Sequence, residues 1–394
     1  MDRRARALTV PVVHVITRLE LGGAQQNTLH TVATLDRTRF EPWLVTGPGG
    51  LLDDEARALE GVQLRFVPEL VRPIRPGKDL AAARALRDLL RPLVARGPLV
   101  VHTHSSKAGV VGRWAARWAG ARPVVHSVHG FGHQAVGGGL LSRATRIMER
   151  LVARHTDAFI SVARCHVDEG RRRGLFGKAP VHMVRSGIDI ADFARADGLR
   201  AAARRELELP PDAPVVGMIA CLKPQKAPVD MVEVAAEVLR TRDDAHFFLA
   251  GDGELREAVE ERAAQLGLGR RLRLLGWRRD IPELLGALDV LLLTSRWEGL
   301  PRVCPQAMAA GRPIVATRVD GIPEAVVDGR NGYLVEPGDV RGAARRLVEL
   351  LGDADLRRRF GAAGRAAVDE FDQQQMVRAQ EALYDELIQT ARSR

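Results

Sequence analysis

The sequence predicts an α/β protein with two doubly wound domains, each a parallel sheet covered by helices on both faces. Its 394 residues are long for one domain and sufficient for two. Short apolar runs alternate with amphipathic stretches along the chain, as in parallel sheets whose strands are joined by helices. Turn-forming residues interrupt this alternation at RSGIDIADF (185–193), and it then restarts.

The first half of the chain supplies the first sheet, and we assign residues 1–188 to an N-terminal domain. Its strand candidates are Leu8–Thr17, Pro42–Thr46, Val62–Val67, Leu99–Thr103, Pro123–Val128, Ala158–Val162 and Val181–Val184. The clearest helices between them are Asp79–Ala95, Ser105–Ala119 and Leu141–His155.

The second half repeats the pattern over residues 189–372. Strands and helices alternate as Pro214–Ala220, Val229–Arg240, His246–Ala250, Glu254–Leu266 and Leu272–Leu275, and later strands follow at DVLLLT (289–294) and RPIVAT (312–317). Two such domains facing one another would form a cleft at the carboxyl ends of both sheets, where open α/β folds bind ligands.

The charge is uneven along the chain. Residues 1–190 hold 29 Lys and Arg against 16 Asp and Glu, whereas the remainder holds 30 against 33. This asymmetry favours an anionic partner for the first half, such as anionic lipid headgroups or a diphosphate-linked acceptor. Only 4% of the residues are aromatic and no nucleic-acid motif occurs, so no nucleic acid is expected. A merely solvated Arg-rich surface explains the same counts equally well.

The location expected for the protein is the cytoplasm, with peripheral contact at the inner face of the membrane. The sequence contains no apolar run of membrane-spanning length. In the N-terminal segment, His14, Arg18 and Glu20 argue against a signal peptide and favour a first strand.

Three widely spaced cysteines, Cys165, Cys221 and Cys304, indicate neither a metal site nor a disulfide framework.

The most informative segment is SRWEGLPRVCPQAMAAGRPIVATRVDGIPEAV (295–326). It predicts the end of a strand, a loop, a helix opening near Pro305 and a second strand. Backbone N–H groups at such a helix start favour an anion such as phosphate. The carboxylate of Glu298 can accept hydrogen bonds from hydroxyl groups. Phosphate and hydroxyls together indicate a nucleotide sugar.

This segment resembles the signature of the family 4 glycosyltransferases, which are retaining enzymes of the GT-B fold. Further matches follow in the expected order at VVGMIACLKPQKAP (215–228), FFLAGDGELR (247–256), LRLLGWRRDIPELL (272–285) and NGYLVEPGD (331–339). The N-terminal half is similar more loosely, through LGGAQQ (21–26) and two strand ends that carry histidines. By the same resemblance, residues 373–394 form a C-terminal helix that packs back on the first domain.

The resemblance also implies a donor site. Glu298 would bind a sugar hydroxyl, Lys226 the diphosphate, and Gln306 the ribose, at a position where the family has a second acid. Cys221 stands where the family has an Arg, and Lys223 or Arg302 are candidates to replace that cation. The remaining donor contacts would come from Gly22, Gly23, Trp277, Arg278, Gly299, Leu300, Pro301, Arg302 and Val303. GDG (251–253) is too short for a nucleotide motif and is expected to be a turn.

Histidines gather at two predicted strand ends. His129 matches the active-site histidine of the family and would lie next to the donor hexose. His104, Ser105 and Lys107 are weaker candidates for the acceptor side. His102, His104, His126, His129 and His133 together raise the alternative of a metal site, but no carboxylate or cysteine accompanies them, so no metal and no other cofactor are expected.

The resemblance therefore implies transfer of a hexose-type sugar from a nucleoside diphosphate sugar to a lipid-linked or polysaccharide acceptor in envelope assembly. Because Cys221 and Gln306 depart from the family pattern, a non-catalytic subunit or scaffold remains the alternative. A nucleotide-sugar epimerase is a further alternative, although it would need more carboxylates than Glu298 for its acid–base steps.

Overall fold

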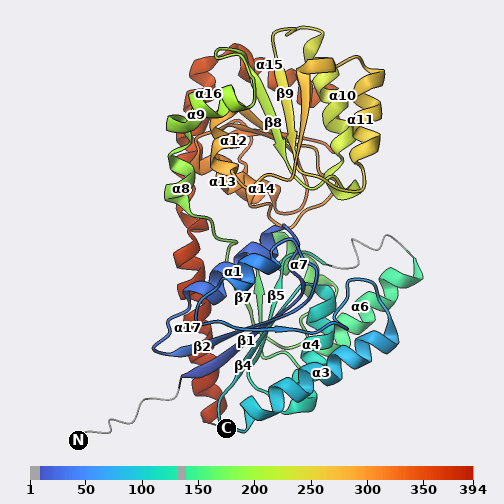
Figure 1. Cartoon of the computed structure of the whole chain (residues 1–394), viewed down its shortest axis with the longest axis vertical. Coiled ribbons are helices and arrows are strands. Elements are labelled where there is room, and N and C mark those ends of the chain that lie inside the picture. The colour runs from blue at the N-terminus through green and yellow to red at the C-terminus, as the bar shows by residue number, and fades with distance from the viewer. Residues whose placement is uncertain (1–8, 132–138, 394) are drawn as a thin grey trace, which may run out of the picture. The chain divides into compact units, whose positions relative to one another are not determined.

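The computed structural model describes residues 9–131 and 139–393 and divides into two compact units. Unit 1 comprises Met1–Gly187 and Gln373–Arg394, and unit 2 comprises Ile188–Asp372 (Figure 1). The last segment of the chain therefore belongs to the same unit as the first.

Unit 1 is built on a parallel sheet with the strand order β3-β2-β1-β4-β5-β6-β7. Its central strands are rich in valine and buried on both faces, as expected when helices cover both sides of a sheet. The strands are β1 (Val10–Arg18), β2 (Phe40–Gly47), β3 (Gln63–Phe66), β4 (Val100–His104), β5 (Val124–Val128), β6 (Ala158–Ser161) and β7 (Val181–Met183).

Alternate residues of these strands pack against different helices. One core joins Val13 and Val101 to the helices α3 and α4, and another joins Val12 and Val100 to α17. The helices of unit 1 are α1 (Gly23–Thr34), α2 (Asp53–Arg57), α3 (Pro76–Val94), α4 (Ser106–Ala119), α6 (Leu140–Ala153), α7 (Arg164–Arg172) and α17 (Gln373–Arg392).

The C-terminal helix α17 is part of the core of unit 1. Tyr384 is fully buried in the same cluster as Phe40, and its ring meets the Phe40 ring edge-on with 6.0 Å between centroids. The Glu381 carboxylate accepts a hydrogen bond of 2.7 Å from the backbone N–H of Asp36. These contacts fix the helix across the sheet.

Unit 2 contains a second parallel sheet, with the order β10-β9-β8-β11-β12-β13. Its strands are β8 (Val215–Ile219), β9 (His246–Ala250), β10 (Leu272–Gly276), β11 (Val290–Leu293), β12 (Ile314–Thr317) and β13 (Gly332–Val335). Its α-helices are α8 (Ile190–Ala194), α9 (Ala196–Glu206), α10 (Pro228–Leu239), α11 (Arg256–Gln265), α12 (Ile281–Ala287), α13 (Val303–Ala309), α14 (Ile322–Ala325), α15 (Val340–Gly352) and α16 (Ala354–Arg365). The 3₁₀-helices are η1 (Pro224–Lys226), η2 (Gly269–Arg271) and η3 (Asp369–Phe371).

The predicted fold class of two doubly wound α/β domains is confirmed. The predicted strands recur in order with bounds shifted by a few residues, and Leu8, the start of the first one, lies outside the described residues. In each sheet the strand order reverses between two neighbours, β1 and β4 in unit 1 and β8 and β11 in unit 2. At such a switch point the loops after the strands diverge, which leaves a crevice at their carboxyl ends.

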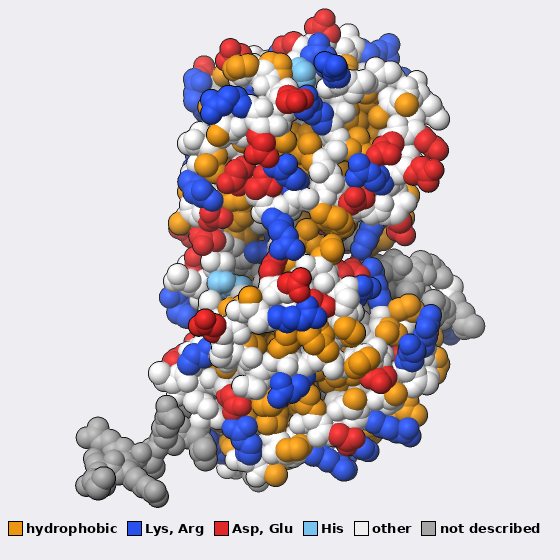
Figure 2. All heavy atoms as spheres, viewed as in Figure 1, with side chains coloured by type: hydrophobic (Ala, Val, Ile, Leu, Met, Phe, Trp, Pro, Cys, Tyr) orange, Lys and Arg blue, Asp and Glu red, His pale blue; other side chains and the backbone are white. Residues whose placement is uncertain are grey.

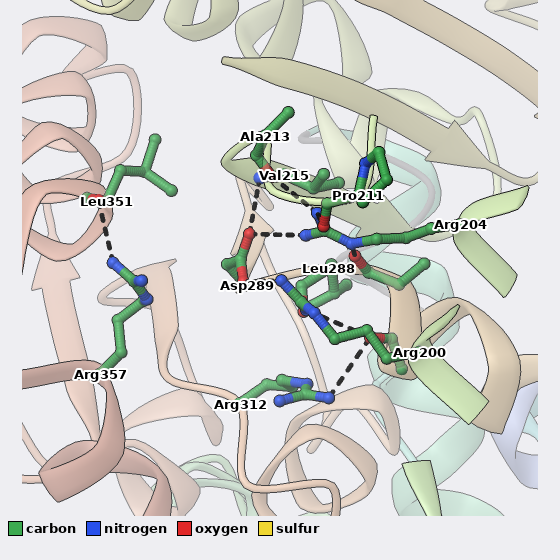
Figure 3. A network of polar contacts seen from close by, with 12 residues as sticks. Arg200, Arg204, Pro211, Ala213, Val215, Leu288, Asp289, Arg312, Leu351 and Arg357 are labelled. Atoms are coloured by element: carbon green, nitrogen blue, oxygen red, sulfur yellow. Dashed lines mark hydrogen bonds and ion pairs between the residues drawn. The ribbon is translucent and has the colours of Figure 1, made fainter. Parts of the chain in front are cut away.

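The opposite, amino-terminal ends of β8 and β11 are held by a buried ionic network (Figure 3). Arg204 of α9 is only 2% exposed, and its guanidinium donates to backbone carbonyls of Pro211 and Ala213 at 2.7 and 2.8 Å. It also pairs with Asp289 at 2.9 Å. Asp289 accepts two further hydrogen bonds, from Arg200 at 2.7 Å and from the N–H of Val215 at 2.8 Å. The network joins α9 to both central strands.

We predict that Asp289→Ala destabilises unit 2 by about 3–5 kcal/mol, because it leaves two arginines without their shared carboxylate in a buried site. The urea midpoint followed by circular dichroism measures this loss. Asp355→Ala is the matched control, since the Asp355 side chain is 77% exposed in its pair with Arg358. Ion pairs at the surface contribute little to stability, so this control should leave the urea midpoint nearly unchanged. Equal shifts of the urea midpoint by the two substitutions would show that the buried network at Asp289 does not stabilise unit 2 as proposed.

Candidate active site

Two loops of unit 2 meet at the switch point. One follows β8 and contains η1, and the other follows β11 and runs from Thr294 to Arg302. The Thr294 hydroxyl donates to the carbonyl oxygens of Lys226 at 3.0 Å and of Ala227 at 2.9 Å. The N–H of Arg296 donates to the Gln225 carbonyl at 2.7 Å. These bonds fix the two loops to each other and bring Lys226 beside Glu298.

Glu298 is the centre of this arrangement. Its carboxylate forms an ion pair with the Lys226 ammonium, and the side chains are 4% and 18% exposed respectively. The same carboxylate accepts a hydrogen bond of 2.6 Å from the Ser295 hydroxyl. Its backbone N–H donates to the Asp320 carboxylate at 2.7 Å, which ties the loop to the segment after β12. Glu298 is therefore held in place from three sides.

The ion pair can exchange its partners with a ligand. Lys226 keeps part of its surface exposed, so an anion such as a phosphate can reach the ammonium. A hydroxyl of the ligand can donate to the Glu298 carboxylate when Lys226 turns to the anion. The nearby Cys304 is not a nucleophile here, because burial, together with the Glu298 carboxylate, raises the pKa of its thiol far above the ordinary value.

The helix expected near Pro305 is present. It begins two residues earlier, at Val303, with Arg302 as the residue that precedes it. Proline is tolerated in a first helical turn because its missing N–H would have no partner within the helix. The earlier start leaves Gly299, Leu300 and Pro301 in the loop.

The residues of α13 are buried, Gln306 included at 8% exposed. Burial lowers the pKa of Arg302 to about 10. The guanidinium therefore stays charged near neutral pH, beside the loop that carries Glu298.

The other donor-site candidates of unit 2 follow β8 and β10. Cys221 lies two residues after the end of β8. The next residue, Leu222, donates a backbone hydrogen bond of 2.9 Å to Asp252 and accepts one of 3.0 Å from Leu255. A Cβ atom at Gly251 would come within 1.9 Å of the Ala220 carbonyl oxygen. GDG (251–253) thus forms a close-packed turn that supports the Cys221 loop.

Trp277 and Arg278 follow β10. The Trp277 side chain is 41% exposed. Arg278 pairs with Asp280 and, at 2.6 Å, with Glu206, and hydrogen bonds to these carboxylates raise the pKa of its guanidinium. Its charge is therefore already compensated by protein groups.

The predicted site residues of unit 1 lie around the carboxyl ends of β1, β4 and β5. Gly22 adopts an extended conformation immediately before α1, and Gly23 is the first residue of that helix. The backbone N–H groups of a first helical turn have no partner within the helix and can bind an anion. His104 ends β4, and His129 follows β5, with 3.3 Å between His104 Nδ1 and His129 Nε2.

A histidine cluster extends inward from His129, and it includes His14, which the sequence did not connect with the other histidines. His14 lies opposite His102 across β1 and β4, and its Nδ1 is 2.9 Å from His104 Nε2. Potential ligand atoms of His14, His102 and His104 lie within 4.8 Å of one another. However, His102 uses both ring nitrogens, toward Tyr384 at 2.5 Å and Ser127 at 2.7 Å.

These hydrogen bonds describe a buried polar cluster, in which His14 Nε2 has no hydrogen-bond partner among the described residues. His126 does not belong to it, since its Nδ1 faces Thr103 on the neighbouring strand at 2.9 Å. His133 lies outside the described residues. The absence of a metal therefore stays a prediction.

Ser105 and Lys107 lie at the start of α4. The Ser105 hydroxyl is 2.8 Å from that of Thr17, which joins the loops after β1 and β4. Lys107 pairs with Asp79 at 2.6 Å and also donates to the Pro73 carbonyl. Both residues line a large cavity of unit 1.

Comparison with known proteins identifies the class. The model of the glycosyl transferases group 1 matches residues 200–367, and the model of the glycosyl transferase 4-like domain matches residues 22–187. The Escherichia coli UDP-Gal:alpha-D-GlcNAc-diphosphoundecaprenol alpha-1,3-galactosyltransferase is 32% identical over 363 residues, which cover 88% of this chain and 89% of that enzyme. The D-inositol 3-phosphate glycosyltransferase of Nocardia farcinica is 31% identical. The match covers 92% of this chain and 85% of that enzyme.

Solved structures show the same fold. Anabaena Alr3699/HepE in complex with UDP-glucose superimposes with a TM-score of 0.81 at 21% identity, covering 96% of this chain and all of that one. WaaG, a glycosyltransferase involved in lipopolysaccharide biosynthesis, gives a TM-score of 0.72 at 17% identity over 95% of this chain and 99% of that one. The fold and these relatives define a glycosyltransferase. The chain belongs to the family 4 glycosyltransferases with the GT-B fold, as the sequence predicted.

Within residues 9–131 and 139–393, no helix combines the length and the apolar character needed to cross a membrane.

The buried histidines predict a pH dependence of stability. Burial lowers the pKa of His14 to about 3 and that of His129 to about 4, and it lowers those of His102, His104 and His126 well below the ordinary value of 6.5. Below that value the unfolded chain binds protons that the folded chain excludes. The free energy of unfolding should therefore fall as the pH drops from 6.5 toward 4, by up to about 1.4 kcal/mol per pH unit for each histidine.

Urea denaturation at about pH 7.5 and about pH 5.5 measures this effect. We expect a lower midpoint at the lower pH, and a smaller difference in His126→Asn, which has one titrating group fewer. A midpoint that does not change over this range would show that these histidines take up protons while folded.

Proposed function

We propose that the protein transfers a hexose from a nucleoside diphosphate sugar to a lipid-linked or polysaccharide acceptor, with retention of anomeric configuration and without a metal ion. The observation that carries this proposal is the paired Lys226 and Glu298 at the switch point of unit 2. The pair offers a cation for the diphosphate and a carboxylate for a sugar hydroxyl at one place. The names of the relatives support a sugar nucleotide and a lipid-linked acceptor.

In this mechanism the sugar–phosphate bond breaks as negative charge develops on the leaving diphosphate. Lys226 stabilises that charge, which is the role that a divalent ion has in other transferases. The acceptor oxygen bonds to the anomeric carbon on the face that the phosphate leaves. Its proton passes to an oxygen of the departing phosphate, so no protein base is required.

Glu298 orients the donor in this proposal. Its carboxylate is fixed by the Ser295 hydroxyl and accepts a hydrogen bond from a hydroxyl of the hexose. In unit 1, the lowered pKa of His129 keeps its ring neutral near neutral pH, so the ring can form hydrogen bonds to a ligand without adding a charge.

Transfer activity tests the proposal directly. Purified protein is incubated with UDP-galactose or UDP-glucose and a diphosphate-linked saccharide, and the anomeric configuration of the product is read by NMR. We expect a retained configuration and the same rate in EDTA. Loss of activity in EDTA that Mg²⁺ restores would contradict the metal-independent mechanism, and an inverted product would contradict the retaining one.

Lys226→Ala should lower kcat by about 10²–10³-fold, because it removes the group that stabilises the leaving diphosphate. Glu298→Gln keeps the shape of the side chain and should lower the rate through loss of the carboxylate. Lys178→Ala, at an exposed position of unit 1, is the control and should retain full activity. Full activity of Lys226→Ala would remove the basis of the proposed site.

The second candidate function is that of a non-catalytic subunit or scaffold, which Cys221 and Gln306 favour. A scaffold should neither transfer nor hydrolyse any sugar nucleotide, whereas the enzyme should slowly hydrolyse its donor in the absence of acceptor.

The variant Gln306→Glu further distinguishes a nucleotide-binding enzyme from a non-catalytic scaffold. A carboxylate accepts hydroxyl hydrogen bonds about twice as strongly as an amide, so the variant should bind the nucleotide several-fold more tightly. Isothermal titration calorimetry with UDP measures the change. Unchanged or weaker binding would show that Gln306 does not contact the nucleotide.

A further inference from the structure

Unit 1 contains an apolar groove that the proposed donor site does not use. The cavity has a volume of about 800 Å³, which lies within the range of small-molecule binding sites. Its walls come from α3, α4, α6 and the loop before α3. We call it the three-helix groove, and its apolar lining includes Ile74, Leu80, Val110, Trp114, Trp118 and Met148.

One end of the three-helix groove is polar and lies at the carboxyl edge of the sheet. There the lining includes Thr17 and Arg18 at the end of β1, Ser105 directly after β4, and Lys107 at the start of α4. Arg72 and Lys107 at this end pair with Glu20 at 3.2 Å and with Asp79 at 2.6 Å. Each cation can exchange its carboxylate partner for a phosphate oxygen. The groove thus begins at residues assigned to the acceptor side.

The rim of the groove has the composition of a surface that faces anionic lipid. The side chains of Ile74 and Trp118 are 58% and 42% exposed, although they are large and apolar. Helices α3, α4 and α6 together carry 10 Lys and Arg against 3 Asp and Glu. Hydrophobic side chains lie among Lys and Arg on the face of unit 1 seen in Figure 2. Mixed apolar and basic surfaces of this kind bind at the headgroup level of anionic bilayers.

We propose that the three-helix groove binds the hydrocarbon chain of a lipid-linked acceptor, with the phosphate of the lipid at the end formed by Arg72, Ser105 and Lys107. This inference rests on the proposed transfer to a lipid-linked acceptor and adds the site that selects the lipid. The apolar walls take the first part of the chain out of water, and the basic rim holds the protein at the membrane from which the chain emerges.

Binding of a soluble prenyl diphosphate tests the groove without any transfer reaction. Farnesyl diphosphate is the probe, and inorganic pyrophosphate is the same headgroup without a chain. Calorimetry measures the binding, and the tryptophan emission of the protein, to which Trp114 and Trp118 in the lining contribute, reports whether the probe reaches the groove. We expect farnesyl diphosphate to bind at least about tenfold more tightly than pyrophosphate and to shift the tryptophan emission to shorter wavelength.

Two neighbouring residues of α6 provide matched variants. Met148 lines the groove and is 39% exposed, whereas Ile147 is 51% exposed and is not among the lining residues. Met148→Asp should weaken farnesyl diphosphate binding by about tenfold, because a carboxylate then faces the chain. Ile147→Asp should change it by less than about twofold. Both positions are at the surface, so both variants should fold, and circular dichroism checks this.

Two results would overturn the proposal. One is equal affinity for farnesyl diphosphate and pyrophosphate, which would show that the chain contributes nothing. The other is an equal loss in Met148→Asp and Ile147→Asp, which would place the lipid on the outer surface instead of in the groove. Binding of UDP and hydrolysis of UDP-galactose are measured on the same samples. If these persist while the prenyl probe fails, the groove assignment is wrong and the proposed function stands.

Discussion

The pairing of Lys226 with Glu298 is the interaction on which the proposed site depends. Neither charge would be stable alone at its position, since the carboxylate is 4% exposed and the ammonium 18%. The pair neutralises both charges while the protein is free of ligand. In the proposed complex a sugar diphosphate would offer a partner to each, an anion to the lysine and a hydroxyl to the carboxylate. The same contact can therefore stabilise the fold and recognise the donor.

The geometry of this pair follows from the parallel sheet. Because β8 and β11 are neighbours at the switch point, the loops after them start side by side. Thr294 then fixes the backbone of Lys226 and Ala227, and Ala227 adopts a left-handed conformation with φ of 44°. Such a conformation is unfavourable for a residue with a side chain and persists only where surrounding contacts impose it. The ionic network at Asp289 holds the other ends of the same two strands.

Sequence patterns predict the elements well and their mutual contacts poorly. The strands around Glu298 could be predicted because DVLLLT and RPIVAT are short apolar runs bounded by turn residues. The start of α13 could be predicted only to within two residues, since proline fits any position of a first helical turn. The contacts of Glu298 with Ser295 and Asp320 depend on how three loops meet. Likewise, His14 and His102 are distant in the sequence and lie side by side only because of the register between β1 and β4. Resemblance to a family supplied the roles of residues that local pattern alone left open.

The central claim is that unit 2 binds a nucleoside diphosphate through Lys226 without a metal ion. Thermal unfolding with UDP and GDP at millimolar concentration, each with and without EDTA, tests it most directly, because a ligand of the folded state raises Tm by mass action. The account predicts a rise in Tm with one of the two nucleotides, unchanged by EDTA and absent in Lys226→Ala. No rise with either nucleotide, or a rise that persists in Lys226→Ala, would contradict it.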